Sequence, residues 1–223
     1  MKILFDTANL AVLEEMVPLY PLAGVTTNPT ILTKEGRIDV YKHLRQIRRL
    51  IGPDRSLHIQ VLASGADAMV EEAHRMIEQV DDQVFVKVPT TEQGLRAIRL
   101  LKDEGVRVTA TAIYSKVQGM LAIAAGADYL APYFNRMESQ GADARATVSS
   151  LAQFAERHGT DCTVMVASFK NVAQVSDAFD SGATAVTVPP ALLREALTAP
   201  AVTQAVAAFT QDWSQVFGTT TLP

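Results

Sequence analysis

The sequence has little of several features that define particular classes of protein. Its one cysteine, Cys162, cannot form an internal disulfide, and within the apolar run CTVMVA we expect it to be a small buried side chain. No apolar run approaches the length of a membrane span. The start of the chain, MKILFDTAN, lacks the long apolar stretch of a signal peptide. We therefore expect a soluble, cytoplasmic protein without a membrane partner.

Strong net charge and metal-binding patterns are also missing. A net charge of −4 and a pI near 5.6 argue against nucleic acid as the main partner. The four histidines have no metal-ligand spacing such as H-E-x-x-H, and we expect His43, His74 and His158 on helix surfaces or at helix ends. No P-loop, G-x-G-x-x-G or G-x-S-x-G motif is present. These absences favour a protein that uses no metal and no cofactor.

Short apolar runs alternate with helix-period segments along the whole chain. The predicted strands are residues 2–6, 24–27, 57–62, 84–88, 107–111, 129–133, 163–167 and 185–188. Helical segments such as 67–80 and 92–104 lie between them, and a glycine that could end a helix stands at or just before the start of four of the strands (Gly24, Gly105, Gly126 and Gly182). Eight such units in 223 residues predict one (β/α)8 TIM-barrel domain over residues 1–223. A doubly wound open sheet is the alternative.

Polar residues stand where nearly every predicted strand ends. They are Asp6, Asn28, Gln60, Lys87, Thr111, Tyr133 and Ser168, with Arg136 just beyond the sixth strand. Each has an ordinary alternative role: Asp6 or Ser168 could cap a helix, and Asn28 could form a turn before Pro29. Because the carboxyl ends of the strands of a barrel meet at one face, we expect these side chains to converge.

Lys87 is the most unusual member of this set, since it lies in the apolar strand VFVKVP. A lysine with an ordinary pKa is neutral in only about one molecule in 2,500 at pH 7. Burial disfavours the ammonium form and lowers the pKa. The alternatives are an edge-strand or snorkelling lysine, and a closed barrel has no edge strand. The setting favours an amine that attacks a carbonyl and forms a Schiff base.

At this point the sequence resembles the transaldolase family, and most closely its small fructose-6-phosphate aldolases. The resemblance rests on FDTAN (5–9), AGVTTNPT (23–30), VKVP (86–89), TAIYS (111–115), APYFNR (131–136), ASFK (167–170) and DW (212–213). It implies a class I, metal-independent aldolase on a TIM barrel. It also implies a homo-oligomer, two rings of five subunits, in which a C-terminal helix reaches a neighbour.

The same resemblance implies a role for each residue at the strand ends. Lys87 matches the Schiff-base lysine. Asp6, Asn28 and Ser168 match residues that hold donor hydroxyls, and Arg136 with Ser168 matches the acceptor phosphate site. Gln60, Thr111 and Tyr133 match the group that positions a catalytic water.

Two positions distinguish an aldolase from a transaldolase. Similar transaldolases have glutamate at position 60 and phenylalanine at position 133, whereas this chain has Gln60 and Tyr133. A glutamine can only orient a water, so proton transfer would move to the Tyr133 hydroxyl. We therefore expect cleavage of fructose 6-phosphate to dihydroxyacetone and glyceraldehyde 3-phosphate. Transfer of a dihydroxyacetone unit between sugar phosphates, or a non-catalytic sugar-phosphate-binding barrel, are the alternatives.

Three further features stay open at this stage. His58 and Thr109 depart from the apolar residues of close relatives, and both are expected to point inward in one layer beneath Lys87. They form a hydrogen-bonded core pair, or else His58 adjusts the pKa of Lys87 or narrows the pocket. The helix predicted over residues 203–217 carries an aromatic stripe that packs either on its own barrel or on a neighbouring subunit.

Overall fold

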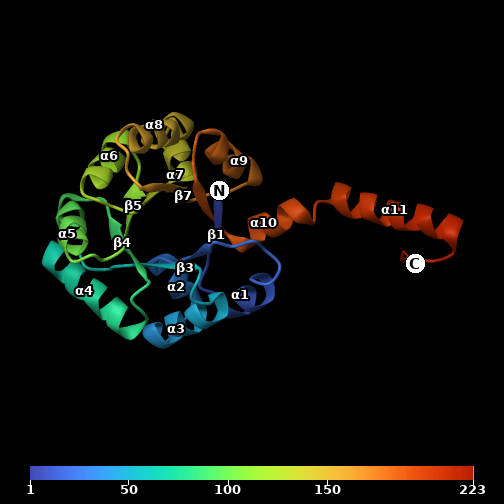
Figure 1. Cartoon of the computed structure of the whole chain (residues 1–223), viewed down its shortest axis with the longest axis horizontal. Helices are drawn as coiled ribbons and strands as arrows, with labels where there is room; N and C mark the ends of the chain where they lie inside the picture. The colour runs from blue at the N-terminus through green and yellow to red at the C-terminus, as the bar shows by residue number, and fades with distance from the viewer. Residues whose placement is uncertain (223) are drawn as a thin grey trace. The chain divides into compact units, whose positions relative to one another are not determined.

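The computed structural model describes residues 1–222, and its contacts divide the chain into two compact units after Pro190. The first unit is a closed barrel of eight parallel strands, which confirms the predicted fold (Figure 1). The strands, in chain and barrel order, are β1 (Lys2–Asp6), β2 (Gly24–Thr26), β3 (Ser56–Gln60), β4 (Phe85–Pro89), β5 (Val108–Ile113), β6 (Tyr129–Pro132), β7 (Thr163–Val166) and β8 (Ala185–Val188).

Helices follow each of the strands β1 to β7 and cover the outside of the barrel (Figure 1). Those of the first unit are α1 (Leu10–Met16), α2 (Pro29–Leu32), the short 3-10 helix η1 (Thr33–Glu35), α3 (Val40–Ile51), α4 (Ala66–Gln79), α5 (Glu92–Asp103), α6 (Lys116–Ala124), α7 (Phe134–Ser139), α8 (Ala144–Arg157) and α9 (Val172–Asp180). The helices present an apolar face to strands that are buried on both sides, as in other parallel barrels.

Side-chain caps fix where several of these helices begin. Asn9, Asn28, Thr91 and Asn171 each accept a hydrogen bond from a backbone N–H in the first turn of the helix that follows. Asn28 therefore does cap α2. Neither Asp6 nor Ser168 is a cap, because Asn9 and Asn171 fill those positions. Both side chains at the strand ends are thus left for other contacts.

Three of the four glycines act as expected. Gly105, Gly126 and Gly182 have positive φ angles of 76°, 93° and 96°, which suit a chain that leaves a helix. The expectation for Gly24 is wrong, since it is the first residue of β2. A Cβ atom there would lie 2.4 Å from the backbone oxygen of Ser56, so the close approach of β2 to β3 requires glycine.

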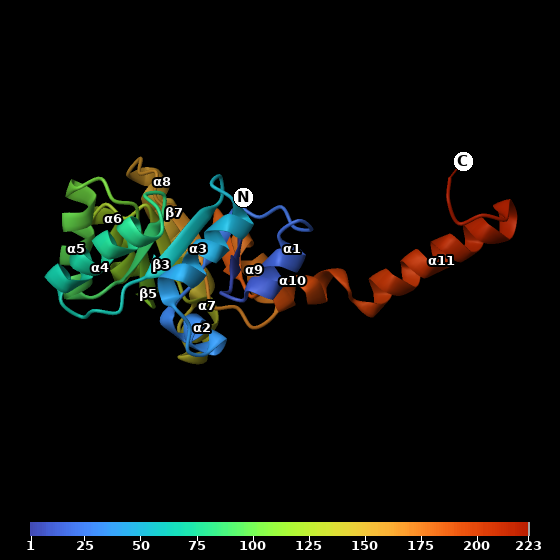
Figure 2. The same ribbon diagram turned by 90° about the horizontal axis from the view of Figure 1, so that it is seen from below.

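Two short helices occupy the same end of the barrel. Figure 2 shows α2 and α7 together at its lower edge. They follow β2 and β6, so this is the end at which the strands terminate. Side chains from the strand ends and from these two helices therefore meet there.

The second unit consists mainly of α10 (Pro190–Leu197) and α11 (Pro200–Phe217). The helix predicted over 203–217 thus begins three residues earlier, with Pro200 in its first turn. Val206, Phe209 and Phe217 are exposed, and Trp213 stacks on Phe217 with ring centroids 4.0 Å apart. None of the helices in residues 1–222 is both long and apolar enough to cross a membrane.

Candidate active site

The carboxyl ends of the strands surround a cavity of about 320 Å³. Six of the eight residues singled out from the sequence line it: Asp6, Asn28, Lys87, Tyr133, Arg136 and Ser168. They come from β1, the β2–α2 junction, β4, the β6–α7 junction, α7 and the segment after β7. Barrel closure therefore brings together side chains that are up to 162 residues apart.

Lys87 lies at the base of this cavity and is only 3% exposed. Its Nζ donates a hydrogen bond of 2.8 Å to the backbone oxygen of Thr27, the residue that follows β2. Burial lowers the pKa of the Lys87 amine below its ordinary value, and the negative charge of Asp6 opposes that shift. The geometry thus makes the neutral, nucleophilic amine more accessible than it is in water.

Asp6 is held from below by two buried threonines. Thr26 Oγ1 donates to Asp6 Oδ1 at 2.7 Å, and Thr187 Oγ1 lies 2.6 Å from Thr26 Oγ1. Since the single proton of Thr26 is used on Asp6, Thr187 must be the donor to Thr26. Burial raises the pKa of the Asp6 carboxyl, while the Lys87 charge and the Thr26 hydrogen bond lower it.

Tyr133 brings a phenol to the wall of the cavity next to Thr111. Its hydroxyl lies 3.1 Å from Thr111 Oγ1, and either group can be the donor. Burial raises the pKa of Tyr133, so the phenol keeps its proton at neutral pH. Thr111 does not line the cavity and reaches it only through this hydrogen bond.

The local backbone of β5 and β6 differs from the predicted one. β5 continues to Ile113 through a register shift, and Ala112 has a positive φ of 57°. Tyr133 lies just beyond β6 and pairs with Ala167 through an isolated bridge. A left-handed non-glycine residue is costly, and such residues gather at functional sites. The bulge follows Thr111 directly, at the point where that residue meets Tyr133.

Ser168 is the second non-glycine residue with positive φ, at 66°. Its backbone oxygen accepts a hydrogen bond of 2.9 Å from Asn135 N, which ties the segment after β7 to α7. Arg136 extends over the Tyr133 ring, with its guanidinium carbon 4.7 Å from the centroid, and donates to Tyr114 Oη at 3.1 Å. That hydrogen bond raises the pKa of Arg136, which stays charged at the cavity mouth.

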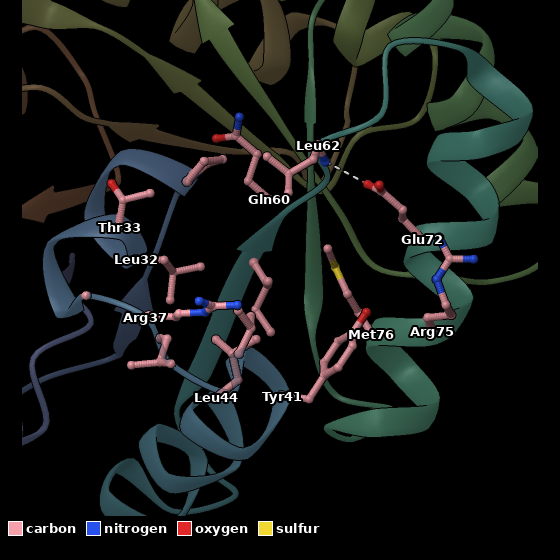
Figure 3. A pocket seen from close by; sticks show the side chains of 15 residues that line it. Leu32, Thr33, Arg37, Tyr41, Leu44, Gln60, Leu62, Glu72, Arg75 and Met76 are labelled. Carbon is pink, nitrogen blue, oxygen red and sulfur yellow. Dashed lines mark hydrogen bonds between the residues drawn. The ribbon is translucent and has the colours of Figure 1, made fainter.

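Gln60 is placed differently from the other residues. It is the register partner of Lys87, but it lines a second, mainly apolar cavity of about 380 Å³ between β3, α3 and α4. In Figure 3 its amide points away from Tyr41 and Met76 at the far end of that cavity. Its Oε1 is buried without a hydrogen-bond partner in the described chain, so it remains available to a further donor.

Several residues near the site were not singled out from the sequence. Thr27 receives the Lys87 hydrogen bond, and Thr26 with Thr187 supports Asp6. Lys34 and Lys170 line the cavity mouth beside Arg136. Strand alternation could have found Thr26, because it precedes Asn28 by two. Lys34 lies in the single turn η1 and Lys170 in the segment after β7, and neither stretch is long enough to show a periodicity.

Other expectations about titratable residues had mixed outcomes. His58 Nδ1 lies 2.8 Å from Thr109 Oγ1, which confirms the predicted pair. The expectation for His43 is wrong: it is 7% exposed, and its Nε2 lies 2.7 Å from the Ala8 oxygen. Cys162 precedes β7 and is only partly buried, with burial raising the pKa of its thiol to about 12. Within residues 1–222, no group of three or more His, Cys, Asp or Glu side chains could hold a metal ion.

Comparison with known proteins agrees with this geometry. The family model "Transaldolase/Fructose-6-phosphate aldolase" matches residues 3–220. A protein of Streptococcus pneumoniae named "Probable fructose-6-phosphate aldolase" is 44% identical over 213 residues, which cover 96% of each chain. From this match over nearly its whole length, we conclude that the chain belongs to the transaldolase/fructose-6-phosphate aldolase family.

Proposed function

We propose that this protein is a class I aldolase. It reversibly cleaves fructose 6-phosphate to dihydroxyacetone and glyceraldehyde 3-phosphate through a Schiff base on Lys87. The observation that carries the proposal is a buried lysine with a lowered pKa at the base of a polar cavity. No metal or cofactor is needed in this reaction, because the iminium itself withdraws electrons from the sugar.

The donor end of the sugar is assigned to Asp6, Asn28 and Ser168. The Asn28 oxygen is already occupied by its helix cap, so the amide nitrogen is the group that can donate to a sugar hydroxyl. Asp6 can accept from a hydroxyl through the oxygen that Thr26 does not use. These groups fix the chain of the sugar so that its C2 carbonyl faces the amine.

The bond-breaking step needs a proton to leave the C4 hydroxyl. The neutral Lys87 amine first adds to C2 and expels water, which gives the iminium. A water held by Tyr133, Thr111 and Gln60 then accepts the C4 proton, and the C3–C4 electron pair moves into the iminium. Tyr133 and the water return a proton to C3 of the enamine, and hydrolysis releases dihydroxyacetone. The 3.1 Å contact between Tyr133 and Thr111 supports this shared role.

The phosphate end is assigned to Arg136 together with Ser168. Arg136 is held by Tyr114 and Tyr133 at the mouth of the cavity, where Lys34 and Lys170 add further positive charge. A guanidinium fixed in this way suits a phosphate dianion.

We further propose that the protein is a homodecamer of two pentamer rings in which α11 docks on a neighbouring subunit. The exposed apolar side chains of α11, including Val206, Phe209 and Phe217, support this assignment. Phe209→Asp places a charge on that face and is expected to dissociate the oligomer, as measured by light scattering. A monomeric wild-type protein would contradict the proposal, and Gln211→Asp is the control on the same helix.

Borohydride reduction in the presence of dihydroxyacetone tests the Schiff base. The reduced adduct is expected on Lys87 and is mapped by peptide mass spectrometry. Lys87→Met should give no adduct, because it removes the nitrogen that attacks the carbonyl. The exposed Lys42→Met variant is the control, and an adduct on another lysine would sink the mechanism.

Cleavage without an added acceptor separates the aldolase from a transaldolase. An aldolase hydrolyses its enamine, so fructose 6-phosphate alone should release stoichiometric glyceraldehyde 3-phosphate over many turnovers. A transaldolase retains the three-carbon unit until a second aldose arrives. Turnover that appears only after an aldose phosphate is added would therefore favour the transaldolase reaction.

The pH dependence of iminium formation tests the interaction between Lys87 and Asp6. The amine must be neutral, so the rate should rise with pH through the lowered pKa of Lys87. Because the charge of Asp6 raises that pKa, Asp6→Asn should move the acid limb to lower pH. The measurement is borohydride-trapped adduct against pH, with Asp143→Asn as the control. If the acid limb of this pH profile stays in place or moves to higher pH in Asp6→Asn, the proposed effect of Asp6 on the pKa of Lys87 is refuted.

A further inference from the structure

A closed set of hydrogen bonds lies beneath Lys87, centred on His58. The imidazole is fully buried in the middle of β3. Its Nδ1 lies 2.8 Å from Thr109 Oγ1, and its Nε2 lies 2.9 Å from Ser56 Oγ. Both ring nitrogens therefore have partners, which is what a buried imidazole requires.

The direction of these hydrogen bonds follows from the hydroxyl group of Ser56. When Ser56 Oγ donates its only proton to the backbone oxygen of Ala23, 3.3 Å away, it accepts from His58 Nε2. His58 thus carries its proton on Nε2, and Nδ1 accepts from the Thr109 hydroxyl. The chain of donors runs from Thr109 through His58 and Ser56 to Ala23. It is satisfied with the imidazole neutral and in one tautomer.

The register of the sheet shows where the hydrogen bond between His58 and Thr109 lies relative to Lys87. On β3, His58 is level with Phe85, and on β5, Thr109 is level with Lys87. The bond between His58 and Thr109 consequently crosses the inner face of β4 between Phe85 and Lys87. The imidazole ring also stacks on the Phe85 ring, with centroids 4.7 Å apart, and makes an edge-on contact with the Tyr129 ring, with centroids 5.0 Å apart.

The backbone of His58 makes a second connection to the amine. Its carbonyl oxygen accepts from Thr27 N at 2.9 Å and from Thr27 Oγ1 at 3.3 Å. The carbonyl of the same Thr27 accepts the hydrogen bond from Lys87 Nζ. His58 therefore contacts Thr109 through its side chain and Thr27 through its backbone. Thr27 in turn accepts the hydrogen bond from the Lys87 amine.

We propose that His58 is a positioning residue for Lys87, acting as a neutral imidazole locked in the Nε2–H form by Thr109 and Ser56. The inference rests on the proposed Schiff-base function of Lys87. Through Thr109 it fixes the level of β5 against the lysine, and through its carbonyl it fixes Thr27. His58, Thr109 and Ser56 are not among the residues that line the cavity, so we expect their effect on the position of the amine and not on binding of the sugar.

The charges around His58 are consistent with a neutral ring. Burial lowers its pKa well below the ordinary value, and the cations that face it add to this shift. They are Lys87 on β4, Lys2 on β1 and Arg48 on α3, and the titratable Tyr129 of β6 accepts a hydrogen bond from Lys2. A neutral imidazole also adds no further positive charge beneath the lysine.

Thr109→Val tests the proposal with little change of shape, since it removes only the donor to Nδ1. Leaving a buried acceptor unpaired should lower kcat for fructose 6-phosphate cleavage by about tenfold or more, with KM changed less than about twofold. Thr109→Ser restores the hydroxyl and should recover most of kcat. Thr147→Val, which removes a buried threonine hydroxyl bonded within α8, is the matched control and should behave as the wild type.

The tautomer is tested separately by NMR of protein labelled with 15N-histidine. His58, assigned by the signal lost in His58→Phe, should show the neutral Nε2–H form at all values between about pH 5 and 8. Titration of His58 in that range, or a proton on Nδ1, would contradict the proposed neutral Nε2–H tautomer. Full kcat in Thr109→Val while the protein folds normally would overturn the positioning role.

These outcomes differ from failure of the proposed function. If borohydride traps no adduct on Lys87 of the wild type, the Schiff-base function itself fails, whatever the histidine spectra show. If the adduct forms and Thr109→Val traps it as fast as the wild type across the pH range, the function stands and the role of His58 is refuted.

Discussion

The burial of one ammonium group is the constraint on which the rest of this site depends. Lys87 is almost inaccessible to water, and its removal from solvent favours the neutral amine. The negative charge of Asp6 raises the pKa of the amine, so burial and Asp6 shift that pKa in opposite directions. A hydrogen bond from Thr26, which is itself bonded to Thr187, keeps that carboxylate in place. A barrel core is the natural setting for such a balance, because every strand is buried on both faces.

Two directed chains of hydroxyl groups support the site from different sides. Thr187 and Thr26 donate hydrogen bonds in sequence toward Asp6, whereas Thr109, His58 and Ser56 donate in sequence toward Ala23. In each chain every hydroxyl proton has one acceptor, and no group is left to reorient. Preorganised polar groups of this kind lose little free energy to rearrangement when charge develops nearby.

Much of the barrel could be predicted because its strands are short apolar runs with polar ends. The convergence of Asp6, Lys87 and Ser168 followed from closure alone. What could not be predicted depends on tertiary contacts. Nothing local marks the left-handed Ala112 behind the shift in β5, because alanine rarely adopts that conformation. Gln60 had the expected neighbour on β4, yet its side chain lines the cavity beside α3 and α4.

The hydrogen bond from Lys87 to Thr27 has a stereoelectronic consequence. A carbonyl oxygen can only accept, so the amine must keep an N–H directed at Thr27 whether or not it is protonated. When the proton that makes it an ammonium leaves, the remaining N–H bond still faces β2, and the lone pair is left to point elsewhere. The backbone carbonyl of Thr27 thereby excludes one direction from which the nitrogen of Lys87 can form a bond.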